Sequence, residues 1–168
     1  MQKTANNLII LISLFSAISV IGPVNLSAKS AVHDYAKIKT YLKNPKSYIA
    51  IVWPITPLAA DPQIEELLGK YGKILHKSAI MLSKTDAYVL LRTAHPHILN
   101  TAEHVRWYFP PGAFERPARV YIILFDSLDI ATEAKHKIRR LFNLQYRAIH
   151  INDTRAETKQ LSKFFFKK

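Results

Sequence analysis

The chain has 168 residues, 49% of them hydrophobic and 21% charged, a balance that indicates a globular protein and excludes wholesale disorder. It has no cysteine and only four glycines, which excludes disulfides, thiolate metal sites and glycine-rich nucleotide loops of the Rossmann or P-loop kind. The net charge of +12 favours anionic partners, or else reflects a solvated basic surface.

The first thirty residues predict delivery of the chain to a membrane. Lys3 precedes an uncharged run, Leu8–Ile21, and the small residues Ala28 and Ser30 resemble a cleavage site. The run is shorter than the ~20 residues that span a bilayer. We therefore expect residues 1–30 to be a cleaved signal peptide and the domain over 31–168 to be secreted or periplasmic, with an uncleaved N-terminal anchor as the alternative.

Helices and strands alternate in the first half of the domain. Apolar spacing predicts, in chain order, a helix over 31–46, a strand over 47–53, a helix over 61–71, a strand over 73–82 and another strand over 88–92. Asp61-Pro62 is typical of a helix start with Asp61 as the N-cap, and Gly72 is placed to cap the other end.

The second half continues the alternation to the end of the chain. It predicts a helix after Asn100, a loop over 109–117, a strand over 119–125, a helix from 126 or 127 to about 141, a strand over 146–152 and a last helix whose capping box is Thr154 and Glu157. This order indicates the α/β class, with α+β as the alternative. We expect a single-domain sandwich of two or three layers around a mixed sheet of about five strands.

The segment Ala148–Thr154 is the most informative for function. It puts His150, Asn152, Asp153 and Thr154 at the carboxyl end of a strand that leads into a helix. Ligands gather at such strand ends, and a helix N-terminus favours anions. His150 and Asp153 are therefore the candidate catalytic residues, and Asn152 and Thr154 candidate ligand contacts. The alternative is that the acid and hydroxyl are ordinary helix caps and the histidine an internal residue.

Two residues elsewhere complete the candidate site. Trp53 ends the first strand, where it is either a stacking platform or a core residue. Arg139 would hold a phosphate if its helix turned it towards the strand of His150. The alternative is that Arg139 belongs to a solvated face with Lys135, Lys137 and Arg140.

Two further clusters carry weaker signals. His95, His97 and His104 suggest a metal site, but their spacing matches no specific motif, so we assign no metal and identify no cofactor. Basic residues of the last helix, with Phe164–Phe166, suggest contact with a membrane or nucleic acid. Solvated terminal lysines are the alternative reading of that tail.

The carboxyl third resembles that of nucleoside diphosphate kinases. The shared features are the Ile138-Arg139 pair, an Ile-His strand ending in His150, an acid three residues later and a hydroxyl residue leading into a helix. The resemblance implies that the histidine carries a phosphoryl group. Ile151 stands where that family has a glycine, and the lysine of its first strand has no counterpart here.

The runs 137–142 and 150–158 also resemble a small bacterial family of unassigned chemistry, sometimes encoded near surface-polysaccharide genes. This resemblance implies that Arg139, His150 and Asp153 form its signature, without naming a reaction.

Three functions remain open from the sequence. The first is an exported basic domain that binds an anionic ligand around His150: a phosphate-bearing small molecule, a polysaccharide or an anionic membrane surface, with nucleic acid less favoured. The second is an enzyme of phosphoryl or nucleotidyl transfer that uses His150. The third is an envelope interaction protein without an active site.

Overall fold

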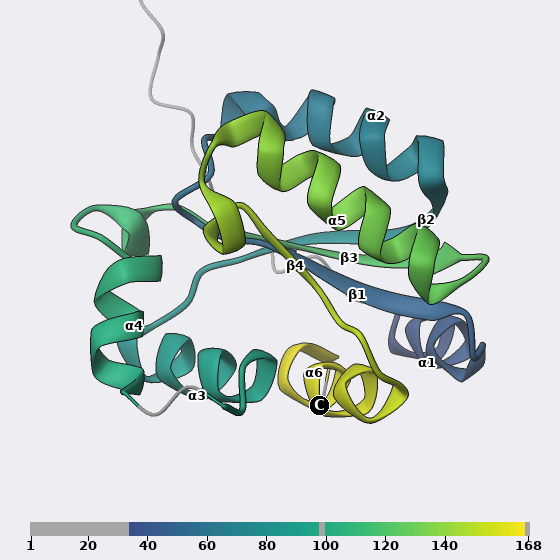
Figure 1. Ribbon diagram of the computed structural model, residues 1–168. Coiled ribbons are helices and arrows are strands. Elements are labelled where there is room, and N and C mark those ends of the chain that lie inside the picture. The colour runs from purple at the N-terminus through teal and green to yellow at the C-terminus, as the bar shows by residue number, and fades with distance from the viewer. Residues whose placement is uncertain (1–33, 98–99, 167–168) are drawn as a thin grey trace, which may run out of the picture.

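The computed structural model describes residues 34–97 and 100–166 (Figure 1). The expected leader over 1–30 lies outside these residues. The elements are α1 (Tyr35–Lys43), β1 (Ser47–Val52), α2 (Asp61–Tyr71), β2 (Gly72–Ile80), α3 (Lys84–Ala94), α4 (Thr101–Tyr108), β3 (Ala118–Phe125), α5 (Leu128–Phe142), β4 (Ile149–Ile151) and α6 (Arg155–Phe166). Within the described part of the chain, no helix is long and apolar enough to cross a membrane.

The four strands form one sheet in the order β2-β3-β1-β4, and every neighbouring pair is antiparallel. With α2 between β1 and β2, and α5 between β3 and β4, this is the split β-α-β, or ferredoxin-like, arrangement. Helices α3 and α4 are inserted between its two halves. The predicted α/β class is confirmed, but the sheet is antiparallel rather than mixed and has four strands rather than about five.

Alternation along the strands divides the core into two parts. Ile49 and Ile51 of β1 pack on one side of the sheet, and Ala50 and Val52 pack on the other. Helices α2 and α5 cover the second side, while α1, α3 and α6 cover the first (Figure 1). The sandwich therefore has three layers.

The strand predicted over 88–92 is wrong, because these residues lie in helix α3. Ser83 caps that helix: its hydroxyl accepts from the N–H of Asp86, whose carboxylate accepts from the N–H of Ser83. The residues of α3 that face the core are spaced as a helix requires: Ala87, Leu90, Leu91 and Ala94. The apolar run was short enough to suit either element.

Both ends of α2 differ from expectation in detail. Ala60 holds the N-cap position, and the carboxylate of Asp61 instead accepts from Nε of the buried Arg119 at 2.9 Å. Gly72 has extended backbone, with φ −159°, and begins β2. A Cβ on Gly72 would lie 2.5 Å from the carbonyl oxygen of Leu124, so glycine is required by the close approach of β3.

Strand β4 is the outer strand of the sheet on the side of the predicted site. It is shorter than the predicted strand over 146–152, because residues Gln145–Arg147 form a 3₁₀ turn. The carbonyls of Ile149 and Ile151 point away from β1 and need partners. They accept from Nε of Arg139 at 3.1 Å and from Nζ of Lys135 at 3.0 Å. Side chains of α5 thus close this edge of the sheet and are fixed beside His150.

Candidate anion-binding cleft

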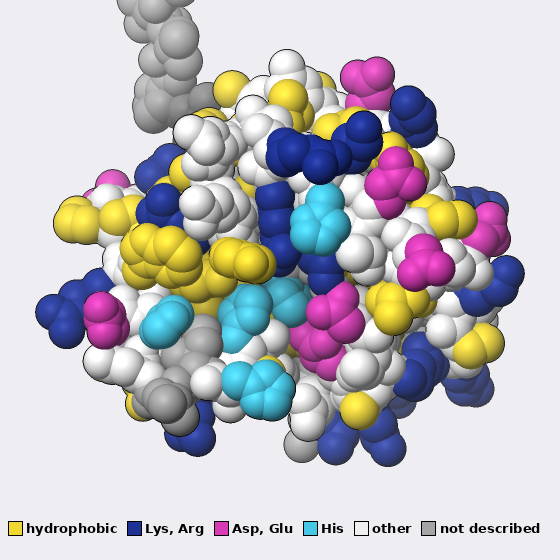
Figure 2. Space-filling view, in the orientation of Figure 1, with side chains coloured by type: hydrophobic (Ala, Val, Ile, Leu, Met, Phe, Trp, Pro, Cys, Tyr) yellow, Lys and Arg dark blue, Asp and Glu magenta, His cyan; other side chains and the backbone are white. Residues whose placement is uncertain are grey.

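A cleft of about 700 Å³ lies along the outer edge of β4. Its walls come from the end of α3, one face of α5 and the first two turns of α6. Figure 2 shows histidine side chains gathered near the middle of this face, with lysine or arginine side chains on one side of them and acidic ones on another. The cleft is therefore polar and built from segments far apart in the sequence.

His150 is held by the first turn of α6. Its imidazole is 3% exposed, and Nε2 lies 2.5 Å from Oε1 of Glu157. The other oxygen of Glu157 accepts from the backbone N–H of Asp153 at 2.9 Å, and Thr154 accepts from the N–H of Glu157 at 3.1 Å. The predicted capping box thus forms, except that the carboxylate of Glu157 accepts from the N–H of Asp153 rather than from that of Thr154. It also fixes the carboxylate that orients His150.

A carboxylate can only accept, so Nε2 of His150 carries the hydrogen in this pair. Within the described chain, Nδ1 of His150 makes no hydrogen bond. A neutral imidazole held in this way keeps a lone pair on Nδ1. His150 therefore has the orientation that a nucleophile or general base requires.

Lys135 is buried rather than part of a solvated helix face. Its ammonium forms a close ion pair with Asp153, in addition to its bond to the carbonyl of Ile151. The carboxylate of Asp153 is about half exposed, while the lysine is 7% exposed. The positive charge of Lys135 is consequently balanced by the carboxylate of Asp153.

Arg139, unlike Lys135, forms no ion pair with a carboxylate among the described residues. Its guanidinium lies over the ring of Tyr146, 4.7 Å from the centroid, and its Nε binds the carbonyl of Ile149. No carboxylate in residues 34–97 and 100–166 pairs with it, and its two Nη groups donate no hydrogen bond there. Burial lowers the pKa of Arg139. A partly buried guanidinium with free donors is a ready partner for a planar or tetrahedral anion.

The pKa of His95 reflects both its burial and the positive charges around the cleft. Its ring packs edge-on against His150, with centroids 4.9 Å apart, and Nε2 lies 3.3 Å from the hydroxyl of Tyr108. Burial, and then the neighbouring His150, Arg139, His104 and Lys135, lower the pKa of His95 to about 3. The imidazole is therefore uncharged at neutral pH, in surroundings that disfavour a further positive charge.

The structure brings together four of the six predicted site residues. Arg139, His150, Asp153 and Thr154 all line the cleft. Asn152 does not, because its amide is used within the core: Oδ1 accepts from the N–H of Ile49 at 2.6 Å, and Nδ2 donates to the hydroxyl of Thr158 at 2.8 Å. Its expected role as a ligand contact is replaced by a structural one.

Trp53 is also internal. Its side chain is fully buried, and its ring packs against Tyr108 and Phe109 beneath the surface. The core reading of Trp53 is thus the one that its burial supports.

Four further residues of the cleft show what the sequence analysis missed. Lys135 precedes Arg139 by one helical turn, so it shares the face that Arg139 presents, and this spacing was a usable signal. Glu157 was recognised only as a cap. Tyr146 carried no local signal. His95 was considered only as a metal ligand, because it reaches the cleft through the packing of α3 against α6.

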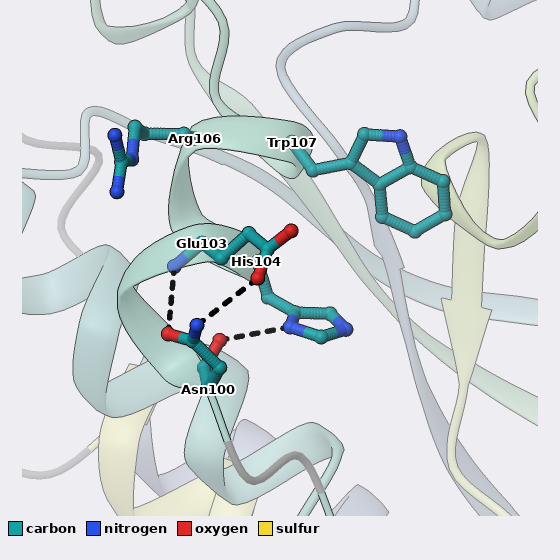
Figure 3. A pocket seen from close by; sticks show the side chains of 5 residues that line it. All are labelled: Asn100, Glu103, His104, Arg106 and Trp107. Carbon is teal, nitrogen blue, oxygen red and sulfur yellow. Dashed lines mark hydrogen bonds between the residues drawn. The ribbon is translucent and has the colours of Figure 1, made fainter.

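A second hollow lies over α4 and is lined by Asn100, Glu103, His104, Arg106 and Trp107 (Figure 3). The amide of Asn100 exchanges two hydrogen bonds with Glu103, and the carbonyl of Asn100 contacts Nδ1 of His104 at 2.9 Å. These groups cap the helix, so little polar capacity remains for a ligand. Among the residues described, no three histidines or acids lie close enough to hold a metal ion.

No protein-family model matches the chain, and no curated protein is significantly similar to it.

Proposed function

We propose that the cleft at the edge of β4 binds a phosphate-bearing ligand, with Arg139 as its principal contact. The observation that carries this proposal is the guanidinium of Arg139, whose two Nη groups have neither a carboxylate nor a hydrogen-bond acceptor among the described residues. Partial burial of a guanidinium without a counter-charge is costly, so an anion that occupied the cleft would lower that cost.

The charges around Arg139 support the same conclusion. Asp153 is taken up by Lys135, and Glu157 by His150 and the backbone of Asp153. The two carboxylates nearest the cleft are therefore engaged and oppose an anion less than free carboxylates would. The first turn of α6, which also lines the cleft, adds the positive end of a helix dipole.

The proposed setting is outside the cytoplasm. An apolar run at residues 8–21 precedes the domain and favours export, followed by release or by anchoring. A phosphate-bearing ligand in that setting includes phosphorylated sugars and polysaccharides. The basic composition of the chain would raise their local concentration near the protein.

Binding of inorganic phosphate and pyrophosphate by calorimetry tests this function. Arg139→Gln removes the charge and should weaken binding by about tenfold or more, the usual effect of losing a charge-assisted hydrogen bond. Arg140→Gln is the matched control, because Arg140 is the next residue and is exposed. Equal affinities for wild type and Arg139→Gln, or an equal loss in both variants, would exclude this site.

Phosphoryl transfer through His150 is the second candidate function. The observation that favours it is the His150–Glu157 pair, which fixes the imidazole and leaves Nδ1 without a hydrogen bond in the described chain. In such a step Nδ1 would attack phosphorus, and the bond from phosphorus to the leaving oxygen would break. The leaving oxygen would keep the electron pair and take a proton from water.

This candidate predicts a phosphohistidine. Incubation with acetyl phosphate or a nucleoside triphosphate, followed by mass spectrometry of peptides, should find the modification on His150 and not on the exposed His136. Glu157→Gln should slow its formation, since the amide cannot stabilise the imidazole as it becomes charged. Phosphate binding without any phosphohistidine would leave the cleft as a binding site only.

A further inference from the structure

A groove between α1 and α6 is lined on both sides by lysines. It is separate from the cleft and shares no lining residue with it. Lys39 and Lys43 lie one turn apart on α1, and Lys159 and Lys163 one turn apart on α6. Leu42 and Ser162 lie between the two rows. All four lysines are exposed, and none of the described residues that line the groove is acidic.

The arrangement is electrostatically unfavourable for the isolated domain. Like charges one turn apart on a helix repel each other, and here two such pairs face each other across a groove. In the described part of the chain these four lysines form no ion pair. Arg155 adds a fifth cation, although its guanidinium donates to the carbonyl of Leu42 in α1 and to that of the C-cap residue Asn44, the latter at 3.1 Å.

We propose that this groove binds the anionic headgroups of a membrane. Charge complementarity requires an anionic partner. A membrane is favoured because the groove lies close in sequence to the apolar run. Helix α1 is the first described element, and only residues 22–34 separate it from the apolar run at 8–21. Such a stretch spans at most about 45 Å. Where the apolar run is retained as an anchor, it therefore holds α1, and α6 packed against it, within this distance of the membrane surface.

The test uses the full chain with vesicles of phosphatidylcholine alone, or with about one third phosphatidylglycerol. The apolar run partitions into both, so the readout is the acetylation rate of individual lysines, measured by mass spectrometry. Lys39, Lys43, Lys159 and Lys163 should react several-fold more slowly on the anionic vesicles. Lys70 and Lys137, in the opposite layer, should react equally on both. Equal protection of both layers, or of neither, overturns the proposal.

A charge-reversal pair gives a second measurement. Lys39→Glu with Lys163→Glu should lower the excess binding to anionic vesicles by about tenfold or more, because each cation near such a surface contributes roughly fivefold. Lys70→Glu with Lys137→Glu makes the same change in net charge and should leave most of that excess intact. An equal loss in both pairs would show that net charge alone attracts the protein. Protection by duplex DNA or heparin, with no difference between the two vesicles, would assign the groove to a polyanion instead.

Discussion

At the scale of single residues, His95 is a side chain whose pKa is strongly lowered. Burial is the largest cause, and with the charges of neighbouring side chains acting in the same direction it lowers the pKa of His95 to about 3. In the unfolded chain the same imidazole takes up a proton near pH 6.5. Between these two values the unfolded state binds more protons than the folded state. The neutral form of His95 therefore contributes stability above pH 6.5 that is lost as the pH falls towards 3.

His95→Gln should flatten this dependence. Glutamine does not titrate and still offers an acceptor to the hydroxyl of Tyr108. The melting temperature of the variant should fall less steeply than that of wild type between pH 6.5 and 4, measured by thermal denaturation. His97→Gln, at an exposed position two residues away, should keep the wild-type slope. Parallel curves for wild type and His95→Gln would mean that His95 titrates alike in the folded and unfolded states.

The same scale shows what the sequence could predict of the cleft. His150, Asp153 and Thr154 follow one strand directly, and a strand end followed by a helix cap is a local pattern. Arg139 was reached through its place beside that strand in the order of elements. His95 could not be found in this way, because it approaches His150 only through the packing of α3, a helix that was itself predicted as a strand.

At the scale of elements, Asn152 ties three of them together. Its amide accepts from Ile49 on β1 and donates to Thr158 on α6, while its own N–H pairs with the carbonyl of Ile49. Asn152→Ala would leave the N–H of Ile49 buried without a partner. We expect a loss of about 1–3 kcal/mol in the free energy of unfolding, measured with urea. A stable variant with weakened phosphate binding would instead restore Asn152 as a ligand contact.

Gly72 fixes the start of β2 against β3. A Cβ there would meet Leu124 and Phe125 at under 3 Å, so Gly72→Ala should destabilise the protein by about 1–3 kcal/mol, as overpacking does. Gly69 lies in α2 with nothing within 4 Å of an added Cβ. Gly69→Ala should therefore stabilise by about 0.5–1 kcal/mol. Urea denaturation of the two variants checks the opposite signs; two changes of the same sign would contradict the explanation.

Elements with two agreeing signals were predicted correctly. Helix α2 had a proline near its start and apolar residues at helical spacing, and β1 was a continuous apolar run ended by a proline. The strand predicted in the region of α3 rested on a short apolar run alone, and the Ser-x-x-Asp pattern that caps this helix was not recognised in the sequence. Strand direction was beyond local signals, since the antiparallel pairing depends on how two β-α-β halves interleave.

At the scale of the whole molecule, the two proposed anion-binding surfaces share helix α6. Glu157 and Gln160 of this helix line the cleft, whereas Lys159 and Lys163 line the groove on another side of it. No described hydrogen bond joins the groove lysines to the cleft residues. The two proposed sites should therefore interact only through the long-range field of their charges, which salt screens over about 10 Å at 0.1 M.

Thermodynamic linkage makes this independence measurable. Arg139→Gln should leave the protection of the groove lysines on anionic vesicles unchanged, although it weakens phosphate binding. Lys39→Glu with Lys163→Glu should weaken phosphate binding by a small factor at low salt, and by none at high salt, because only the field has changed. Calorimetry of phosphate binding at two salt concentrations distinguishes a long-range effect of charge from a structural coupling between the two sites. A loss of phosphate binding that persists at high salt would mean that α6 itself rearranges and couples the two sites, in which case membrane and ligand must each alter the affinity for the other.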